Sequence, residues 1–344
     1  MTHVGPIHSD DLSDLVSSLL EAAGAASGDA RLVAEQLVDS EARESRSQGL
    51  IRVRPYVTWA RNGQIASPTK LSIEREHGAT LLLDAHKGWG QVATLQAMEM
   101  CVERARTNGA CLALMRNTKH LGRLGYYVEA AARQGYAGVI ACSGNPSAAW
   151  VAPWGGTKPL FGTNPIAFGF PRQGKPPVVV DLSTTQGARG HVLLAAKLGE
   201  LLPEGWAFDA KGFPTRDPAK ALPPNGTLAP LGGHKGYALA LAVEILCGVL
   251  TGIWPPEDGA NFLGAIRIEA FLPLEDYYRS LENLLGEISA GPTAPNTDAI
   301  LIPGEGSARR HQRNLDSGLR IPKELWQDIV NLARDLGVKH QLLS

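Results

Sequence analysis

Segments of two different periodicities alternate along the first half of the chain, and this alternation most constrains the fold. Short aliphatic runs at residues 80–84, 111–116 and 137–143 indicate strands. The residues between them, 91–107 and 126–134, space their apolar side chains as helices do. Each of the first two strands is thus followed by a helix before the next strand begins. Such alternation favours a layered α/β core.

Both ends of the chain are predicted to be helical. Residues 10–23 and 28–43 have helical periodicity, and a final helix at 323–336 is expected to pack against these first helices. Residues 144–172 are rich in glycine and proline, which is typical of ordered loops and short strands around a site. The β-branched residues at 178–181 predict a buried strand.

Composition excludes several classes of protein. A net charge of −1 and a pI near 6.8 offer no basic surface for nucleic acid. No apolar stretch is long enough for a bilayer and no signal segment precedes the first helix, so we expect no membrane partner. The four cysteines lack CxxC spacing and indicate reduced thiols of a cytoplasmic protein. The nine histidines show no HExxH or Cys/His cluster, so no metal site is expected.

One segment matches a dinucleotide fingerprint. Gly88-Trp89-Gly90-Gln91-Val92-Ala93 fits GxGxxA and lies between a predicted strand and a predicted helix. However, three residues separate the strand from the first glycine, whereas the fingerprint turn is tight. In the fingerprint, an acidic residue at the end of the next strand holds the ribose. Here that strand ends at Arg116, which could suit a 2′-phosphate. The segment alone leaves a Rossmann site open without favouring it.

A histidine stands in the strand-to-helix connection that follows residue 116. His120 is followed closely by Gly122 and Gly125, at the end of an aliphatic run and just before a helix. A histidine held in such a turn can be oriented and close to solvent, as a proton donor must be. Because a lone histidine is more often structural, its interpretation depends on what accompanies it.

Six further segments follow that histidine in a fixed order. They are Ala152-Pro153-Trp154-Gly155-Gly156, Gly162-Thr163-Asn164-Pro165, Val180-Asp181-Leu182-Ser183-Thr184, Pro203-Glu204-Gly205-Trp206-Ala207, Gly232-Gly233-His234-Lys235-Gly236-Tyr237 and Pro303-Gly304-Glu305. With residues 117–122 they resemble the malate/L-lactate dehydrogenase type 2 family. This family includes malate, sulfolactate and ureidoglycolate dehydrogenases, diketogulonate reductase and cyclic imino acid reductases. The resemblance extends over nearly the whole chain.

The resemblance implies a particular architecture. We expect a non-Rossmann, three-layer α/β core with a mixed β-sheet, as in L-sulfolactate dehydrogenase, so the GxGxxA segment is rejected as a cofactor site. A helical subdomain is expected from both chain ends, residues 1–75 with 307–344, and the cofactor- and substrate-binding core from residues 76–306. The resemblance also implies a homodimer with the active site between the domains.

The substrate site is expected from residues 47–56, which answer the family pattern SHGxxRxxxY. By that match Arg52 anchors the substrate carboxylate, because the planar guanidinium binds both carboxylate oxygens at once. Ser47 and Tyr56 are expected to hydrogen-bond nearby, and Thr163 to shape the substrate pocket. His120 is the expected proton donor.

The chain departs from the pattern at Gln48, where relatives have a histidine. Glutamine donates and accepts hydrogen bonds but supplies no proton at pH 7. Either His120 carries the proton transfer, or ketone reduction is impaired, or the substrate is an imine that is protonated before the hydride arrives. The leading hypothesis is an NAD(P)-dependent oxidoreductase that interconverts a small 2-oxo acid and its 2-hydroxy acid. The alternatives are a reductase of a cyclic 2-imino acid and a non-catalytic relative.

The resemblance also implies the cofactor site. Lys235 lies just before a predicted helix, where a lysine beside free backbone amides suits phosphate. Relatives tend to have Gly-Lys where this chain has Gly190-His191, so the choice between NADH and NADPH stays open. The expected cofactor-binding residues are Asn145, Asp181, Leu182, Ser183, His234, Lys235, Gly304 and Glu305.

Overall fold

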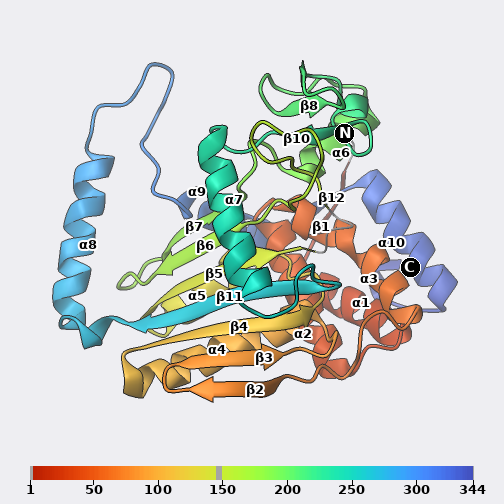
Figure 1. Cartoon of the computed structure of the whole chain (residues 1–344). Helices are drawn as coiled ribbons and strands as arrows, with labels where there is room; N and C mark the ends of the chain where they lie inside the picture. Colours follow the sequence, from red (N-terminus) through yellow and green to blue (C-terminus); the bar gives the residue numbers. More distant parts are fainter. Residues whose placement is uncertain (1–2, 145–148, 344) are drawn as a thin grey trace.

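A seven-stranded sheet forms the centre of the molecule (Figure 1). The computed structural model describes residues 3–144 and 149–343. The strand order is β2-β3-β4-β11-β5-β6-β7. Strands β3 and β4 are parallel and the other neighbouring pairs are antiparallel, so the sheet is mixed, as expected. The strands are β2 (Ser72–His77), β3 (Thr80–Asp84), β4 (Ala110–Thr118), β5 (Tyr136–Ser143), β6 (Ile166–Phe170), β7 (Val178–Leu182) and β11 (Gly259–Arg267).

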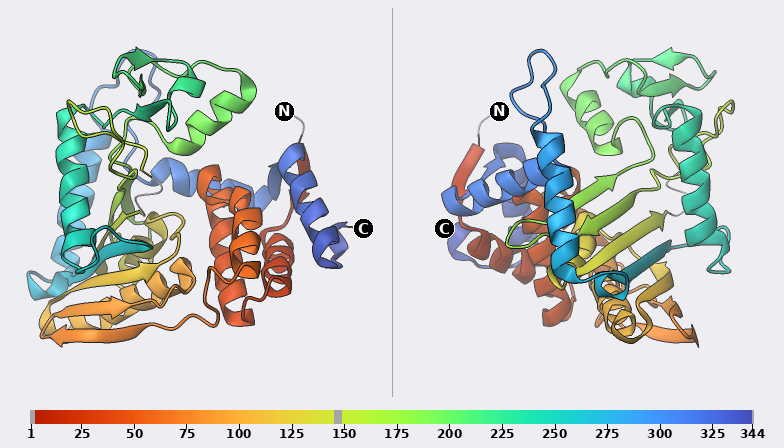
Figure 2. Two further views of the ribbon diagram at one scale, coloured as in Figure 1. Left: turned by 45° about the vertical axis from the view of Figure 1, so that its right-hand side comes forward. Right: turned by 90° about the vertical axis from the view of Figure 1, so that its left-hand side faces the viewer.

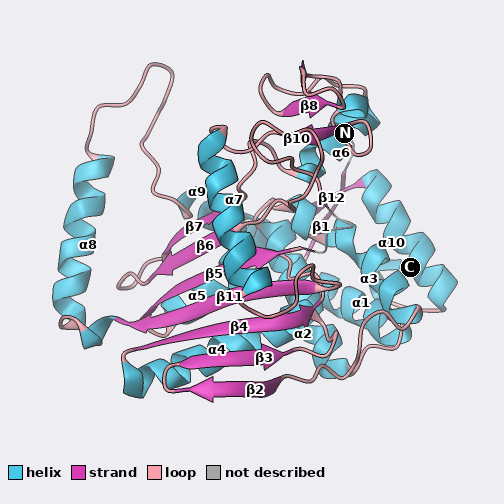
Figure 3. Cartoon of the chain, viewed as in Figure 1, coloured by secondary structure: helices cyan, strands magenta, loops and turns pink. Residues whose placement is uncertain are grey.

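Helices cover both faces of this sheet (Figure 3). On one face α4 (Gly90–Asn108) contacts β4 and β11, and α5 (Gly125–Arg133) contacts β5 and β6. On the other face lie α7 (His234–Glu244) and its π-helical continuation η5 (Ile245–Val249). The predicted three-layer α/β core is therefore confirmed, and the mixed strand order excludes a Rossmann sheet.

Close packing between α5 and the sheet depends on two glycines. A Cβ atom at Gly169 of β6 would lie 2.5 Å from the carbonyl oxygen of Val128, and one at Gly138 of β5 would lie 3.1 Å from the Val128 Cα. Only residues without a side chain let the helix backbone come this near. The aliphatic side chains of β4 that face α4, among them Met115, are fully buried in the same core.

The two chain ends meet in a helical part beside the sheet (Figure 2). It contains α1 (Ser9–Ala22), α2 (Ser27–Ala42), α3 (Val53–Arg61) and α10 (Lys323–Leu336), and β1 (His3–Ile7) pairs with β12 (Leu319–Pro322). The last helix contacts α1, as predicted, and also α3. These elements share one apolar cluster, distinct from the cluster between α4, α5 and the sheet. We propose the division at residues 75 and 307 on that basis.

A third part was not predicted from the sequence. A small sheet of order β10-β8-β9 and helix α6 (Arg189–Leu198) share a separate apolar cluster. This part lies above the edge of the main sheet near β7 (Figure 2). Its strands are β8 (Ala207–Asp209), β9 (Pro214–Thr215) and β10 (Gly226–Leu228).

Two long helices follow β11. Helix α8 (Leu274–Ser289) lies at one side of the molecule (Figure 1), where its Leu285 packs against Val178 of β7, and α9 (Glu305–Ser317) returns to contact α2. The remaining short helices are η1 (Arg46–Gln48), η2 (Leu50–Arg52), η4 (Pro218–Lys220), η6 (Ile268–Ala270) and η7 (Gln341–Leu343).

A buried ionic network joins the helical part to the core. Glu129 of α5 accepts hydrogen bonds from Arg43 Nη2 at 2.9 Å and from Arg123 Nη1 at 3.0 Å. Arg123 also pairs with Asp39 of α2 at 3.1 Å. Glu129, Arg43 and Arg123 are each less than 10% exposed. Buried charges of this kind are tolerated only when each is compensated.

We expect Glu129→Ala to destabilise the protein by about 3–5 kcal/mol, because two buried guanidinium groups would lose one of their two carboxylate partners and share Asp39 alone. Urea unfolding followed by circular dichroism measures the change. The matched control is Glu35→Ala, which removes an exposed ion pair with Arg31 and should cost about 1 kcal/mol or less. Equal losses in the two variants would contradict this account of the network.

Candidate active site

A chain of three hydrogen-bonded side chains holds His120. The histidine lies in the connection between β4 and α5, and its Nδ1 atom is 2.7 Å from the hydroxyl of Tyr56 on α3. The same hydroxyl accepts a hydrogen bond from Gln91 Nε2 of α4 at 2.7 Å. Tyr56 and Gln91 are both 1% exposed. Three elements therefore fix the imidazole, and Nδ1 is the ring nitrogen used for support.

The glycine of the GxGxxA segment has a structural role in this support. A Cβ atom at Gly90 would lie 2.3 Å from the Lys119 carbonyl oxygen and 2.5 Å from that of His120. Glycine thus lets the first turn of α4 touch the backbone that carries His120. The next residue, Gln91, then reaches Tyr56. The fingerprint-like segment therefore builds the surroundings of the histidine.

The imidazole is neutral at physiological pH. Burial, together with the positive charges of Arg52 and Arg189, lowers the pKa of His120 to about 3. Burial also raises the pKa of Tyr56 well above its usual range, so the phenol keeps its proton. A phenol that both donates and accepts can hold Nδ1 in either protonation state of the imidazole.

Hydrogen bonds and close backbone packing fix the loop that carries Arg52. Arg52 Nε donates to the carbonyl oxygen of Ser47 at 2.7 Å. The buried carboxylate of Glu41 accepts from the Leu50 amide at 3.1 Å, and a Cβ atom at Gly49 would lie 2.3 Å from this carboxylate. These contacts fix the backbone of η1 and η2 and bring Arg52 close enough to His120 to lower its pKa.

Gln48 lies in the same loop. Its Oε1 atom is buried and has no hydrogen-bond partner among the described residues. Buried amide oxygens are rarely left without a donor. An N–H or O–H group of a ligand would satisfy this one.

The expected cofactor segments meet at the end of β7. The carboxylate of Asp181 accepts a hydrogen bond from the amide of Gly125, in the first turn of α5, at 2.7 Å. The amide and hydroxyl of Thr184 both donate to the Thr163 carbonyl oxygen at 3.0 Å. The amide of Leu231 donates to the Thr184 carbonyl oxygen at 2.9 Å, which joins this turn to the segment before α7. Leu182 and Ser183 therefore lie between the histidine connection and the start of α7.

His234 and Lys235 form the exposed first turn of α7. A Cβ atom at Gly236 would lie 2.4 Å from the backbone of Leu231, so glycine permits this close approach. His234 packs edge-on to the Trp154 ring with centroids 6.4 Å apart. Within residues 3–144 and 149–343 Lys235 forms no ion pair, so its ammonium is available for an anion.

The last expected segment lies against β7. The Pro303 carbonyl oxygen accepts from the Val179 amide at 3.1 Å, and Gly304 has a φ of 94°, which favours glycine. Glu305 is engaged in ion pairs with Arg172 and Arg309, each at 3.5 Å. Its carboxylate therefore already has partners within the protein.

The structure brings most of the predicted site residues into one region. Contacts join Ser47 to Arg52 and Tyr56 to His120, and Asp181 accepts from the Gly125 amide in the helix turn that follows His120. Thr163 contacts the turn after Asp181, and this turn is bonded to Leu231, shortly before Lys235. Asn145 lies outside the described residues. Gln91 and Arg189 were not predicted to belong to the site. The spacing of neighbouring residues gives no sign that either belongs to the site. Gln91 stood out only as part of the GxGxxA segment, and Arg189 only as the neighbour of the Gly190-His191 pair.

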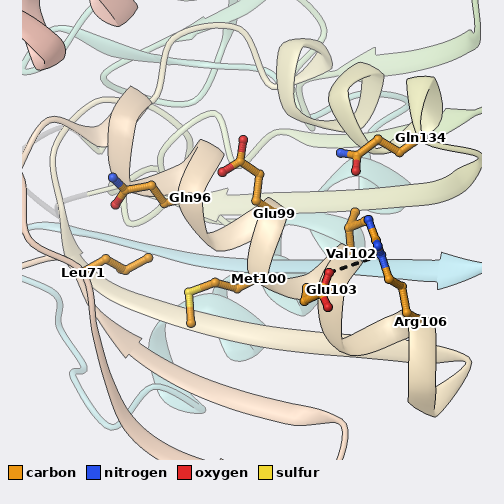
Figure 4. Close-up of a pocket in the computed structure, with 8 residues that line it drawn as sticks. All are labelled: Leu71, Gln96, Glu99, Met100, Val102, Glu103, Arg106 and Gln134. Carbon is orange, nitrogen blue, oxygen red and sulfur yellow. Dashed lines mark ion pairs between the residues drawn. The ribbon is translucent and has the colours of Figure 1, made fainter.

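A hollow on the outer surface of α4 carries none of these residues (Figure 4). Glu103 and Arg106 form an ion pair across one turn of the helix there, at 3.2 Å. Its lining residues are Leu71, Gln96, Glu99, Met100, Val102, Glu103, Arg106 and Gln134.

Comparison with known proteins agrees with this geometry. The family model described as malate/L-lactate dehydrogenase matches residues 7–330. The chain belongs to the malate/L-lactate dehydrogenase family. Malate dehydrogenase of Pyrococcus abyssi is 35% identical over 97% of this chain and 95% of the relative. Delta(1)-pyrroline-2-carboxylate reductase of Pseudomonas fluorescens is 33% identical over 94% of this chain and 96% of the relative.

A solved structure supports the same assignment. Sulfolactate dehydrogenase of Methanocaldococcus jannaschii superimposes with a TM-score of 0.87 at 32% identity, over 97% of this chain and 98% of that chain. The predicted family, the fold and an NAD(P)-dependent dehydrogenase or reductase activity are thereby confirmed. Across the described residues, no helix has the length and apolar character needed to span a membrane.

We expect Tyr56→Phe to lower kcat by roughly ten- to a hundredfold with little change in KM, because the imidazole loses the partner that orients it. Steady-state kinetics over a range of pH measures the effect and also reports a shift of the apparent pKa. Tyr278→Phe, on α8, is the matched control and should behave as the unsubstituted protein. A rise of KM by a similar factor, with kcat unchanged, would contradict an orienting role for Tyr56.

Proposed function

We propose that this enzyme interconverts a small 2-oxo acid and its 2-hydroxy acid, with His120 exchanging the proton and Arg52 binding the carboxylate. The observation that supports this most directly is the Gln91–Tyr56–His120 chain beside a guanidinium. An imidazole supported through Nδ1 offers Nε2 to the substrate oxygen. Arg52, held by the Ser47 carbonyl oxygen, keeps its terminal nitrogens for the two carboxylate oxygens.

The residues expected to hold the nicotinamide cofactor fit such a group. An exposed lysine at a helix N-terminus suits a phosphate, and Lys235 has this position. Gly236 and Gly304 mark places where the backbone comes close to its neighbours. We assign the dinucleotide to Asp181, Leu182, Ser183, His234, Lys235 and Gly304, with Glu305 holding the start of α9. When bound, the nicotinamide supplies or accepts the hydride.

The side chains of the site carry out the other two tasks, which are proton transfer and orientation of the substrate. In the oxidation direction the neutral imidazole of His120 accepts the hydroxyl proton at Nε2. In the reduction direction the protonated imidazole returns this proton to the oxygen as the carbonyl carbon gains the hydride. The Tyr56 hydroxyl stays hydrogen-bonded to Nδ1 in both states. Arg52 fixes the carboxylate and so presents the neighbouring carbon in one orientation.

A second candidate reaction is the reduction of a cyclic 2-imino acid, and one observation favours it. The buried Oε1 atom of Gln48 has no donor among the described residues. The N–H group of a protonated cyclic imine is such a donor. Because this substrate arrives with its proton, it depends less on an acid at position 120.

We also propose that the enzyme is a cytoplasmic homodimer. Leu241, Ile245 and Val249 recur every four residues along α7 and η5 and are 38%, 44% and 51% exposed. Leu250 and Trp254 extend this apolar stripe and are more than half exposed. A second copy of the chain would bury such a patch in a symmetric interface. The four free cysteines support a reducing compartment.

We expect His120→Gln to lower the rate of oxo acid reduction by about a hundredfold or more while leaving cofactor binding unchanged. A panel of 2-oxo acids and cyclic 2-imino acids, assayed with NADH and with NADPH, gives the rates, and fluorescence titration gives the cofactor affinity. His86→Gln, in an exposed turn, is the control. Oxo acid turnover at the original rate in His120→Gln would remove the histidine from the reaction. Turnover of imino acids alone would favour the second candidate.

The double substitution Ile245→Glu and Val249→Glu is expected to convert a dimer to a monomer, because two charges would be buried in each copy of the interface. Light scattering coupled to size-exclusion chromatography measures the mass. Phe213→Glu changes an even more exposed apolar side chain, between β8 and β9, and should leave the mass unchanged. A monomeric parent protein would refute the dimer directly.

A further inference from the structure

Glu244, the last residue of α7, is a buried carboxylate that the mechanism above does not use. Its side chain is 5% exposed. The Oε1 atom accepts a hydrogen bond from Ser143 Oγ at 2.7 Å, and Oε2 accepts one from Asn164 Nδ2 at 2.7 Å. Both donors are neutral, and among the residues that the structure describes Glu244 forms no ion pair. It is therefore a buried anion held by neutral groups alone.

Packing does not account for a carboxylate at this position. Val243 and Cys247, on the same stretch of helix, belong to an apolar cluster between α7 and the sheet. Burial raises the pKa of Glu244, and the hydrogen bonds from Ser143 and Asn164 oppose this effect. An apolar side chain would avoid the cost of burying a charge. What it would lack are the two acceptor oxygens, so we looked to the donors for the role of Glu244.

Asn164 is the donor that α7 holds most completely. It is 1% exposed and has a φ of 32°, in a region that residues other than glycine rarely adopt. Its Nδ2 atom donates to the Ala240 carbonyl oxygen at 3.1 Å as well as to Glu244. The two acceptors lie one turn apart on the same helix. Both amide hydrogens of Asn164 are thus used to keep its backbone in this unusual conformation.

The backbone held at Asn164 supports the turn that follows β7. The Thr163 carbonyl oxygen belongs to the peptide group that joins Thr163 to Asn164, and this group is planar. The φ angle of Asn164 therefore sets the direction of that oxygen. The oxygen accepts from both the amide and the hydroxyl of Thr184 at 3.0 Å. Residues 181–184 form the turn whose Leu182 and Ser183 are assigned above to the dinucleotide.

The same turn is also bonded to the other end of α7. The Leu231 amide donates to the Thr184 carbonyl oxygen at 2.9 Å, and the Gly236 amide donates to the Leu231 carbonyl oxygen at 2.7 Å. Lys235 belongs to that first turn of the helix. The helix therefore meets the turn of residues 181–184 twice, through Leu231 at its start and through Asn164 at its end.

We propose that Glu244 is a positioning residue for the nicotinamide cofactor, which acts through Asn164 to set the turn of residues 181–184 relative to the first turn of α7. Its carboxylate would then control cofactor affinity without touching the cofactor. This inference rests on the proposed function, which assigns the dinucleotide to these two segments. His120 and Arg52 are held by other contacts, so the chemical step should not depend on Glu244.

The first test replaces Glu244 with methionine, which fills a similar volume but accepts no hydrogen bond from Asn164. We expect the dissociation constant of the bound cofactor, NADH or NADPH, to rise by about tenfold or more, equivalent to one lost hydrogen bond to a charged group. Fluorescence titration measures this constant. The value of kcat at saturating cofactor and the KM for the oxo acid should change by less than about threefold.

Glu244→Gln is the conservative variant and should keep the cofactor affinity within about threefold of the original. Its amide oxygen can accept from Asn164 Nδ2, and its amide nitrogen can donate to the Ser143 hydroxyl. Asn164→Asp, in contrast, places a second carboxylate against Glu244 and should weaken cofactor binding. Adding Glu244→Gln to Asn164→Asp should recover part of the affinity, because the glutamine nitrogen can donate to the new carboxylate.

Asp29→Leu is the matched control for loss of a buried carboxylate. Asp29 is 7% exposed and accepts hydrogen bonds from Ser67 and Thr69 in the helical part. Its replacement should lower the free energy of unfolding in urea and leave the cofactor affinity unchanged. The same urea measurement on Glu244→Met separates a loss of stability from a loss of affinity.

The outcomes distinguish this inference from the proposed function. Unchanged cofactor affinity in Glu244→Met would overturn the inference even if stability falls, and so would equal losses in kcat and in the KM for the oxo acid. Unchanged affinity in Lys235→Met would refute the assigned cofactor site, and the inference with it. Reduction of cyclic imino acids alone would refute the oxo acid reaction, whereas the expected pattern of affinities would still support the role of Glu244.

Discussion

The close approach between the first turn of α4 and the backbone of His120 is the contact on which the site depends. It is possible only because residue 90 lacks a Cβ atom, which would lie within 2.5 Å of two carbonyl oxygens. The approach places Gln91 where its amide reaches the Tyr56 hydroxyl, and Tyr56 belongs to the helical part of the molecule. Core and helical part therefore meet at one imidazole, and a shift between them would move the histidine relative to Arg52.

Much of the fold could be predicted from the sequence, but not the way distant strands pair. The alternation in the first half locates β3, α4, β4, α5 and β5 to within a few residues. It cannot show that β11, from much later in the chain, lies between β4 and β5 in the sheet. Helix α8 could have been predicted, since Pro273 precedes it and Glu275 and Asp276 occupy its first turn. Strands β8 to β10 are too short to give a periodic signal.

The candidate site divides in the same way. His120 and Arg52 could be predicted because each lies in a motif that resembles a family pattern. Gln91 and Arg189 owe their positions to contacts with Tyr56 and Trp150, which lie far from them in sequence. Glutamine and arginine on a helix are most often solvated, so neither residue type carries a signal by itself. Their burial and partners appear only in three dimensions.

Burial and the two arginines together determine when His120 is charged. The pKa of its imidazole falls from 6.5 to about 3, first through burial and then through Arg52 and Arg189. Between these values the unfolded chain binds a proton that the folded protein does not, so acidification lowers the free energy of unfolding. An anion on each guanidinium would cancel the electrostatic part of the shift and raise the pKa of the imidazole. Protonation of the imidazole and binding of an anionic substrate would then favour each other, because linkage is reciprocal. Reduction of the oxo acid needs this proton on the imidazole. Oxidation of the hydroxy acid needs a base, and the neutral imidazole of the unliganded site already is one.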